Sequence, residues 1–145
     1  MYKRILLAYD GSDAGQKALL DCQDLAHWSQ SSLFLVAVMP LGLAYVGLEG
    51  GVYDAELEAR ERQRYQAVLN DGLQRLAAAG YSATGEVVAG DAVDQITKQA
   101  RAVNADLIVV GHKHLDGWAA RWWRGSVSRS LIDDAPCSVL VVITR

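Results

Sequence analysis

The sequence lacks the features that mark several special classes of protein. It has only two cysteines, Cys22 and Cys137, and no CxxC pair, so neither a disulfide framework nor a zinc site is predicted. No apolar run approaches the roughly 20 residues that cross a bilayer. The first apolar run ends at Asp10, and a run of this length is too short for a secretory signal. We therefore expect a cytoplasmic protein with a single domain over residues 1–145.

A strong excess of charge of one sign is also lacking. There are 14 lysines and arginines against 17 aspartates and glutamates, which gives a formal net charge of −3. A mildly acidic chain has no positive field to attract nucleic acid or an anionic membrane, so neither is expected as a partner. Hydrophobic residues make up 51% of the chain, which is typical of a globular protein with a full core.

The residues that are present alternate between two kinds of pattern. Apolar runs typical of buried strands alternate with segments of helical periodicity, in the order βαβαβαβαβ. This order favours an α/β fold with an open, doubly wound parallel sheet and helices on both faces. Strands are expected near residues 5–9, 33–39, 81–88, 105–110 and 138–143. Ser12, Asp91 and Ser126 are expected to start helices, and residues 41–53, with four glycines, are expected to form a flexible loop.

Candidate binding residues follow two of the predicted strands. Ligands of open α/β sheets bind beyond the carboxyl ends of the strands, at the switch in strand order. Asp10-Gly11-Ser12 follows the first strand, and Gly111-His112-Lys113-His114 follows the fourth and opens a segment that ends at Gly125-Ser126. Glycines let backbone N–H groups approach phosphate, and a helix start favours an anion. Asp10 could accept from an adenine amino group or a ribose hydroxyl. A purely structural use of these turn residues fits the pattern equally well.

The charged and imidazole side chains near the fourth strand leave two interpretations open. His112 and His114 are two residues apart, and only Asp116 lies near them as a further metal ligand. A solvated or phosphate-facing role is therefore favoured over a metal site. Lys113 and Arg124 either bind terminal phosphates or belong to a polar surface.

Several motifs together resemble the universal stress proteins over the whole chain. They are the opening Ile5 to Ser12, Gly90-Asp91-Ala92, Ala105 to Gly111, Gly125 to Ser128 and Ala135 to Val142. The resemblance implies a flavodoxin-like or Rossmann-like fold with five strands in the order 3-2-1-4-5. It also implies a homodimer joined through the last strand, from Ser138 to Ile143.

The resemblance further implies a nucleotide site, because one branch of the family carries the motif G-x2-G-x9-G-S/T and binds ATP or AMP. In this chain Gly111, Gly125 and Ser126 match that motif and would hold ribose and phosphates. Asp10 and the backbone of Val38 would contact adenine. The residues expected around the nucleotide are Asp10, Gly11, Ser12, Val38, Gly111, His112, Lys113, His114, Arg124, Gly125, Ser126 and Val127. Magnesium would enter only together with ATP.

The chain departs from that motif at two points. His114 stands at the second glycine position, and ten residues rather than nine separate it from Gly125. The preferred hypothesis is a regulatory protein of the stress response that binds ATP or AMP. The alternative is a nucleotide-free dimeric scaffold of the same family. A dedicated enzyme is not predicted, because no nucleophile and base are paired in the sequence, although slow ATP hydrolysis stays possible.

Overall fold

The computed structural model describes residues 2–40, 54–113 and 126–144. The predicted loop at 41–53 lies outside the described residues. The elements are β1 (Arg4–Ala8), α1 (Asp13–Ser29), β2 (Ser32–Met39), α2 (Ala55–Ala78), β3 (Ala83–Ala89), α3 (Ala92–Ala102), β4 (Leu107–Lys113), α5 (Ser126–Asp134) and β5 (Ser138–Thr144). None of the helices in these ranges is both long enough and apolar enough to cross a membrane.

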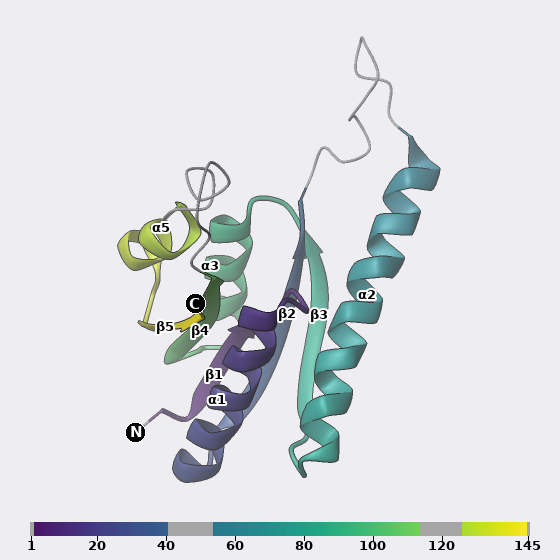
Figure 1. Ribbon diagram of the computed structural model, residues 1–145. Helices are drawn as coiled ribbons and strands as arrows, with labels where there is room; N and C mark the ends of the chain where they lie inside the picture. The colour runs from purple at the N-terminus through teal and green to yellow at the C-terminus, as the bar shows by residue number, and fades with distance from the viewer. Residues whose placement is uncertain (1, 41–53, 114–125, 145) are drawn as a thin grey trace.

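The five strands form one parallel sheet in the order β3-β2-β1-β4-β5. Figure 1 shows α1 and α2 on one face of this sheet and α3 and α5 on the other. The predicted α/β fold and strand order are confirmed. β1 lies at the centre of the sheet. The strand order switches between β1 and β4, because β2 and β3 lie on one side of β1 and β4 and β5 lie on the other.

The two faces of the sheet carry separate apolar clusters. Ile5 and Leu7 of β1 belong to the cluster under α1 and α2, whereas Leu6 belongs to the cluster under α3 and α5. Side chains alternate between the faces of a strand. A strand that is covered on both faces is therefore apolar at every position, which explains the continuous run in the sequence.

Three polar residues, Ser12, Asp91 and Ser126, were predicted to start helices, and two of them cap a helix as predicted. The Ser12 hydroxyl accepts a hydrogen bond from the Gly15 N–H, and the Asp91 carboxylate accepts one from the Asp94 N–H. These bonds satisfy amide groups that have no partner inside the helix. Ser126 differs from the prediction, because it is the first residue of α5 rather than a cap before it.

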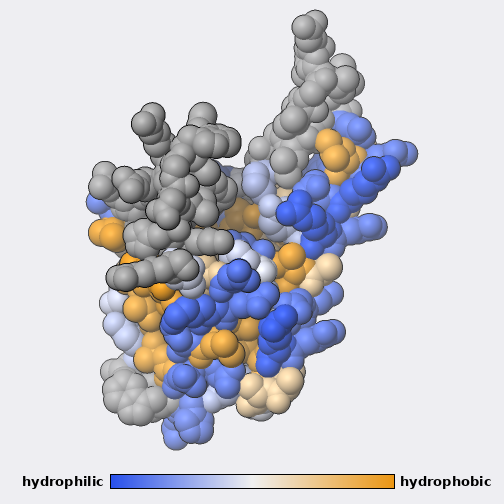
Figure 2. Space-filling model, viewed as in Figure 1, coloured by the Kyte–Doolittle hydropathy of each residue, from blue (hydrophilic) through white to orange (hydrophobic). Residues whose placement is uncertain are grey.

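The edge strands differ in their exposed side chains. β3 is one edge of the sheet, and β5 is the other. Figure 2 shows mostly hydrophilic residues over α2 and hydrophobic residues along the side that carries α5 and β5. Ile132 of α5 and Leu140 and Ile143 of β5 are exposed large hydrophobic residues.

Candidate functional site

β1 ends earlier than both of its neighbours at the carboxyl side of the sheet. The last β1 pairs are Ala8 with Val36 and Ala8 with Val110. β2 then continues for three residues to Met39, and β4 continues for three residues to Lys113. The backbones of β2 and β4 therefore extend past β1 at the switch in strand order, which is where open α/β sheets bind ligands.

The end of β4 corrects one expectation from the sequence. Residues 111–113 were expected to leave the strand, but Gly111, His112 and Lys113 pair with residues 142–144 of β5. These three residues form no apolar run, so their sequence gives no strand signal. The ladder is extended because β5 itself runs to Thr144 and supplies the partner backbone.

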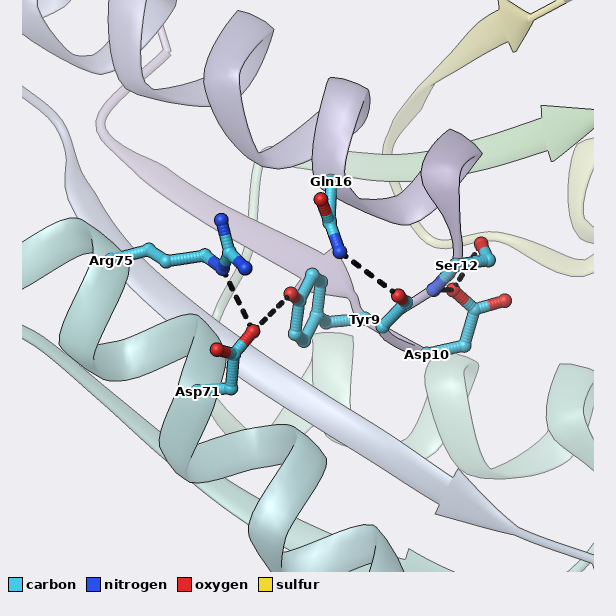
Figure 3. Close-up of polar contacts among 7 residues, drawn as sticks. Tyr9, Asp10, Ser12, Gln16, Asp71 and Arg75 are labelled. Carbon is cyan, nitrogen blue, oxygen red and sulfur yellow. Dashed lines mark hydrogen bonds and ion pairs between the residues drawn. The ribbon is translucent and has the colours of Figure 1, made fainter.

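Asp10 follows β1 directly and is held by the turn that leads into α1. One of its oxygens, Oδ1, accepts hydrogen bonds from the Ser12 N–H (2.9 Å) and from the Ser12 hydroxyl (2.6 Å). The same hydroxyl accepts from the Gly15 N–H at 3.0 Å. Figure 3 shows the Asp10 carboxylate turned back toward Ser12 at the start of α1. Within the described ranges, no hydrogen bond involves the second oxygen, Oδ2, and the residue is exposed.

Ser12 uses its hydroxyl inside this turn. The hydroxyl proton goes to Asp10 and one lone pair receives the Gly15 amide. A hydroxyl has a single proton to donate. Ser12 therefore orients Asp10 and caps α1, and in this arrangement its hydroxyl has no proton for a ligand.

Gly15 and Gly111 allow β4 to lie directly against the first turn of α1. A Cβ atom on Gly111 would lie 2.4 Å from the carbonyl oxygen of Ala14. A Cβ atom on Gly15 would lie 2.5 Å from Oδ1 of Asp10. At Gly111 the close atoms are backbone, so packing requires a glycine there. At Gly15 a side chain would force the Asp10 carboxylate out of its place in the turn. The absence of a side chain at Gly111 thus serves the contact between β4 and α1.

Gly11 places the same turn against α2. Its φ of +76° is a conformation that side chains disfavour. A Cβ atom there would lie 3.3 Å from Cγ1 of Val68. Its carbonyl oxygen accepts a hydrogen bond from Nε2 of Gln16 at 3.2 Å, so the turn is bound to α1 as well.

The backbone of Val38 faces the strip beyond β1. The Tyr9 N–H donates to the Val36 carbonyl, and the Gly90 N–H donates to the Met39 carbonyl, both at 2.9 Å. Peptide groups of successive strand residues point toward opposite neighbours. The peptide groups of Val38, like those of Val36, therefore face the β1 side, where the ladder has already ended. The predicted adenine contact requires this orientation.

Other residues of the expected site are placed only in part. His114, Arg124 and Gly125 lie outside the described residues. His112 and Lys113 are placed as part of the β4 backbone, and Ser126 and Val127 are placed as the first residues of α5. Their expected contacts with phosphate remain predictions.

Tyr9, Asp71 and Arg75 form a polar contact that sequence reasoning missed. The Tyr9 hydroxyl donates to Oδ2 of Asp71 at 2.9 Å, and Nε of Arg75 donates to the same oxygen at 2.8 Å. Burial and the hydrogen bond to Asp71 raise the pKa of Tyr9 to about 12. The hydrogen bonds from Arg75 and Tyr9 hold the pKa of Asp71 below its ordinary value. The partners are 62 positions apart, and polar residues on a helix give no sign of such a pairing.

No metal site is evident in the described part of the chain. Within residues 2–40, 54–113 and 126–144, no three His, Cys, Asp or Glu side chains gather as metal ligands. The two cysteines are free, and burial raises the pKa of the Cys22 thiol to about 12. A thiol of that kind is protonated at neutral pH and unreactive.

The strand order and the carboxylate turn at its switch point define a Rossmann-like α/β protein. Residues 1–142 match the model of the universal stress protein family. A protein named as a universal stress protein in Staphylococcus aureus (strain USA300) is 33% identical over 146 aligned positions, which cover 99% of this chain and 86% of the relative. The chain belongs to the universal stress protein family.

Solved structures of this family share the fold. A member from Burkholderia pseudomallei is 27% identical, with a TM-score of 0.78 over 97% of this chain and 96% of that one. A universal stress protein in complex with cAMP is 24% identical, with a TM-score of 0.72 over 99% and 98% of the two chains. A member from Arabidopsis thaliana with AMP bound is 16% identical, with a TM-score of 0.68 over 99% and 92%. The last two likenesses establish the fold of this chain alone.

Proposed function

We propose that this universal stress protein binds an adenine nucleotide, AMP or ATP, beyond the end of β1 and acts as a regulator of the stress response. The observation that carries the proposal is the Asp10 carboxylate. Its Oδ1 is fixed by Ser12, and its Oδ2 has no partner among the described residues. A carboxylate oxygen is an acceptor, and the adenine amino group and ribose hydroxyls are donors.

The backbone on the other side of the β1 end supplies complementary groups. The peptide groups of Val38 face this strip, and a peptide offers one donor and one acceptor to the edge of a base. Gly111, Gly125 and Ser126 are proposed to hold ribose and phosphates, with the start of α5 favouring an anion. That two proteins of this fold are solved with cAMP and with AMP supports an adenine nucleotide as the ligand class.

Regulation is proposed to act through assembly rather than through chemistry. β5 is an edge strand with exposed hydrophobic residues, Leu140 and Ile143. An apolar edge with free backbone groups pairs readily with another chain. We therefore propose a homodimer joined through Ser138 to Ile143. The proteins that bind this dimer are proposed to differ according to whether the nucleotide site is occupied. We propose no enzymatic activity beyond slow hydrolysis of ATP that is bound together with magnesium.

The second candidate function is a dimeric scaffold that binds no nucleotide. The observation in its favour is that Gly111 is already required for packing against Ala14, so this glycine does not by itself indicate a ligand. The substitution of histidine for glycine at residue 114 points the same way.

Titration calorimetry with AMP and ATP tests the proposal. Asp10→Asn keeps an oxygen for the Ser12 hydrogen bonds but turns the second oxygen into a donor, so we expect AMP affinity to fall about tenfold or more. Asp13→Asn, an exposed carboxylate in the first turn of α1, is the matched control and is expected to leave affinity unchanged. Ser126→Ala is expected to weaken binding by roughly 1–3 kcal/mol if its hydroxyl contacts a charged oxygen. No binding of ATP, ADP or AMP at millimolar concentration by the unmodified protein would contradict the proposal and leave the scaffold.

A further inference from the structure

The segment that carries Asp10 rests on one face of α2. The Tyr9 hydroxyl donates to Asp71 at 2.9 Å. The backbone of Gly72 lies so close to the Tyr9 ring that a Cβ atom there would be 2.8 Å from Cδ1 and from Cε1. Gly11 faces Val68. Residues 68, 71 and 72 are spaced by three and four, so they share one face of the helix.

The hydroxyl of Tyr9 links a buried ring to the surface of the molecule. Tyr9 is 2% exposed, and a buried tyrosine needs a partner for its hydroxyl. That partner, Asp71, is 46% exposed and is itself held by Arg75, which is 51% exposed. Figure 3 shows this contact extending from α2 to Tyr9, next to the turn formed by Asp10 and Ser12.

We propose that Asp71 is a positioning residue for the candidate nucleotide site. It acts through Tyr9: by fixing the tyrosine against α2, it fixes the direction in which Asp10 leaves β1. Tyr9 and Asp10 are adjacent in the chain, and the turn after them is held on its other side by α1 through Ser12 and Gly15. Asp71, on the outer surface of α2, therefore affects the position of the Asp10 carboxylate in the candidate site. The effect on ligand affinity rests on the proposed function, whereas the effect on the turn does not.

Three variants and one matched control test this role. Tyr9→Phe removes only the hydroxyl, and Asp71→Ala removes its acceptor. Asp71→Asn keeps an acceptor oxygen for the tyrosine and is the conservative rescue. Asn70→Ala is the control, because Asn70 makes a similar bond four residues along α2, from Nε2 of Gln66 at 3.0 Å, on exposed side chains.

Hydrogen exchange of the ligand-free protein gives the first readout. The Ser12 and Gly15 amides are bonded within the turn, so their exchange reports its opening. We expect Tyr9→Phe and Asp71→Ala to speed exchange at both amides about tenfold, the size of one hydrogen bond to a charged group. Asp71→Asn should lie nearer the unmodified protein, and Asn70→Ala should match it. Amides in the centre of β1 serve as the reference for global unfolding.

Calorimetry with AMP gives the second readout. We expect Tyr9→Phe and Asp71→Ala to weaken AMP binding roughly threefold to tenfold, and Asn70→Ala to leave it unchanged. Unchanged exchange at Ser12 and Gly15, or exchange that rises only in step with the β1 amides, overturns the positioning role. So does unchanged AMP affinity in variants whose turn exchanges faster. If the unmodified protein binds no nucleotide, the proposed function fails, and the exchange data alone decide whether Asp71 fixes the turn.

Discussion

The two edges of the sheet are built differently. At the β3 edge the consecutive residues Thr84, Gly85 and Glu86 are exposed, and Glu86 accepts a hydrogen bond from Gln99 of α3. At the β5 edge Leu140 is 39% exposed and Ile143 is 49% exposed. Polar and charged residues on an edge strand discourage pairing with other chains, and apolar residues permit it.

The comparison indicates which edge is available for assembly. Backbone groups are unpaired at both edges of any open sheet, so hydrogen bonding alone cannot distinguish them. The side chains can, because burial of Leu140 and Ile143 against a second copy removes apolar surface from water. Pairing at β3 would instead bring the exposed polar residues of that strand, including the charged Glu86, to the interface. We therefore expect self-association through β5 and none through β3.

The largest expected effect comes from a proline in the β5 edge. Val141→Pro removes a backbone donor and fixes φ, so it interrupts pairing along the strand. We expect the unmodified protein to be a dimer at micromolar concentration and the variant to be a monomer, as measured by light scattering after size exclusion.

The matched control for that variant lies at the other edge. Val87→Pro places the same change in β3 and should leave the dimer intact. A monomeric unmodified protein, or a Val87→Pro variant that dissociates as Val141→Pro does, would show that the two edges do not differ in this way.

A smaller effect is expected from filling the space at Gly85. A Cβ atom there would lie 2.8 Å from the Leu35 carbonyl oxygen and 2.9 Å from Cδ1 of Leu69. Gly85→Ala should therefore lower the free energy of unfolding by about 1–3 kcal/mol while the dimer persists. Urea unfolding and light scattering measure the two quantities, with Thr84→Ala as the exposed control. Loss of the dimer in Gly85→Ala would contradict a purely local role for this edge.

The centre of the sheet should respond to alkaline pH in a way that its edges do not. Burial and the bond to Asp71 raise the pKa of Tyr9 from 10.0 to about 12. The stabilisation from the neutral hydroxyl is complete below pH 10 and is lost as the pH rises toward 12. Urea unfolding across this range should show a steeper loss for the unmodified protein than for Tyr9→Phe. Parallel curves would mean that the hydroxyl is not protected in the folded state.

The smallest expected effect is on the strength of the dimer. Ile143→Ser removes part of the exposed apolar surface of β5 and should raise the dimer dissociation constant about tenfold. Leu20→Ser makes the same kind of change on α1, where Leu20 is 60% exposed, and should leave the constant unchanged. Sedimentation equilibrium measures both. Equal effects of the two variants would show that general hydrophobicity, not the β5 edge, drives association.

The strands and helices could be predicted because they depend on local patterns. A strand that is buried on both faces is apolar throughout, as in residues 5–9, and short polar residues such as Ser12 and Asp91 mark helix starts. The family resemblance added the strand order. It also pointed to Asp10, whose carboxylate the structure holds in a turn at the end of β1.

The rest depends on contacts between distant residues. The extension of β4 through Lys113 follows from pairing with β5. The need for glycine at Gly111 follows from its closeness to Ala14, and the bond between Tyr9 and Asp71 joins a strand to a helix. A glycine after a strand has the same sequence signature whether it approaches a ligand or a helix. The packing role of Gly111 therefore could not be recognised from the sequence.

The central place of β1 has a consequence during synthesis on the ribosome. β1 emerges before the other strands of this sheet, and β2 follows at Ser32, but β4 begins only at Leu107. Until then the nascent chain can form the half-sheet β3-β2-β1 alone, with β1 as an open edge that is apolar from Ile5 to Ala8. At a synthesis rate of roughly 5–20 residues per second, that edge of β1 stays unpaired for several seconds before β4 is made. The growing chain is thus most exposed to misassociation, and to chaperones that prevent it, just before β4 is made.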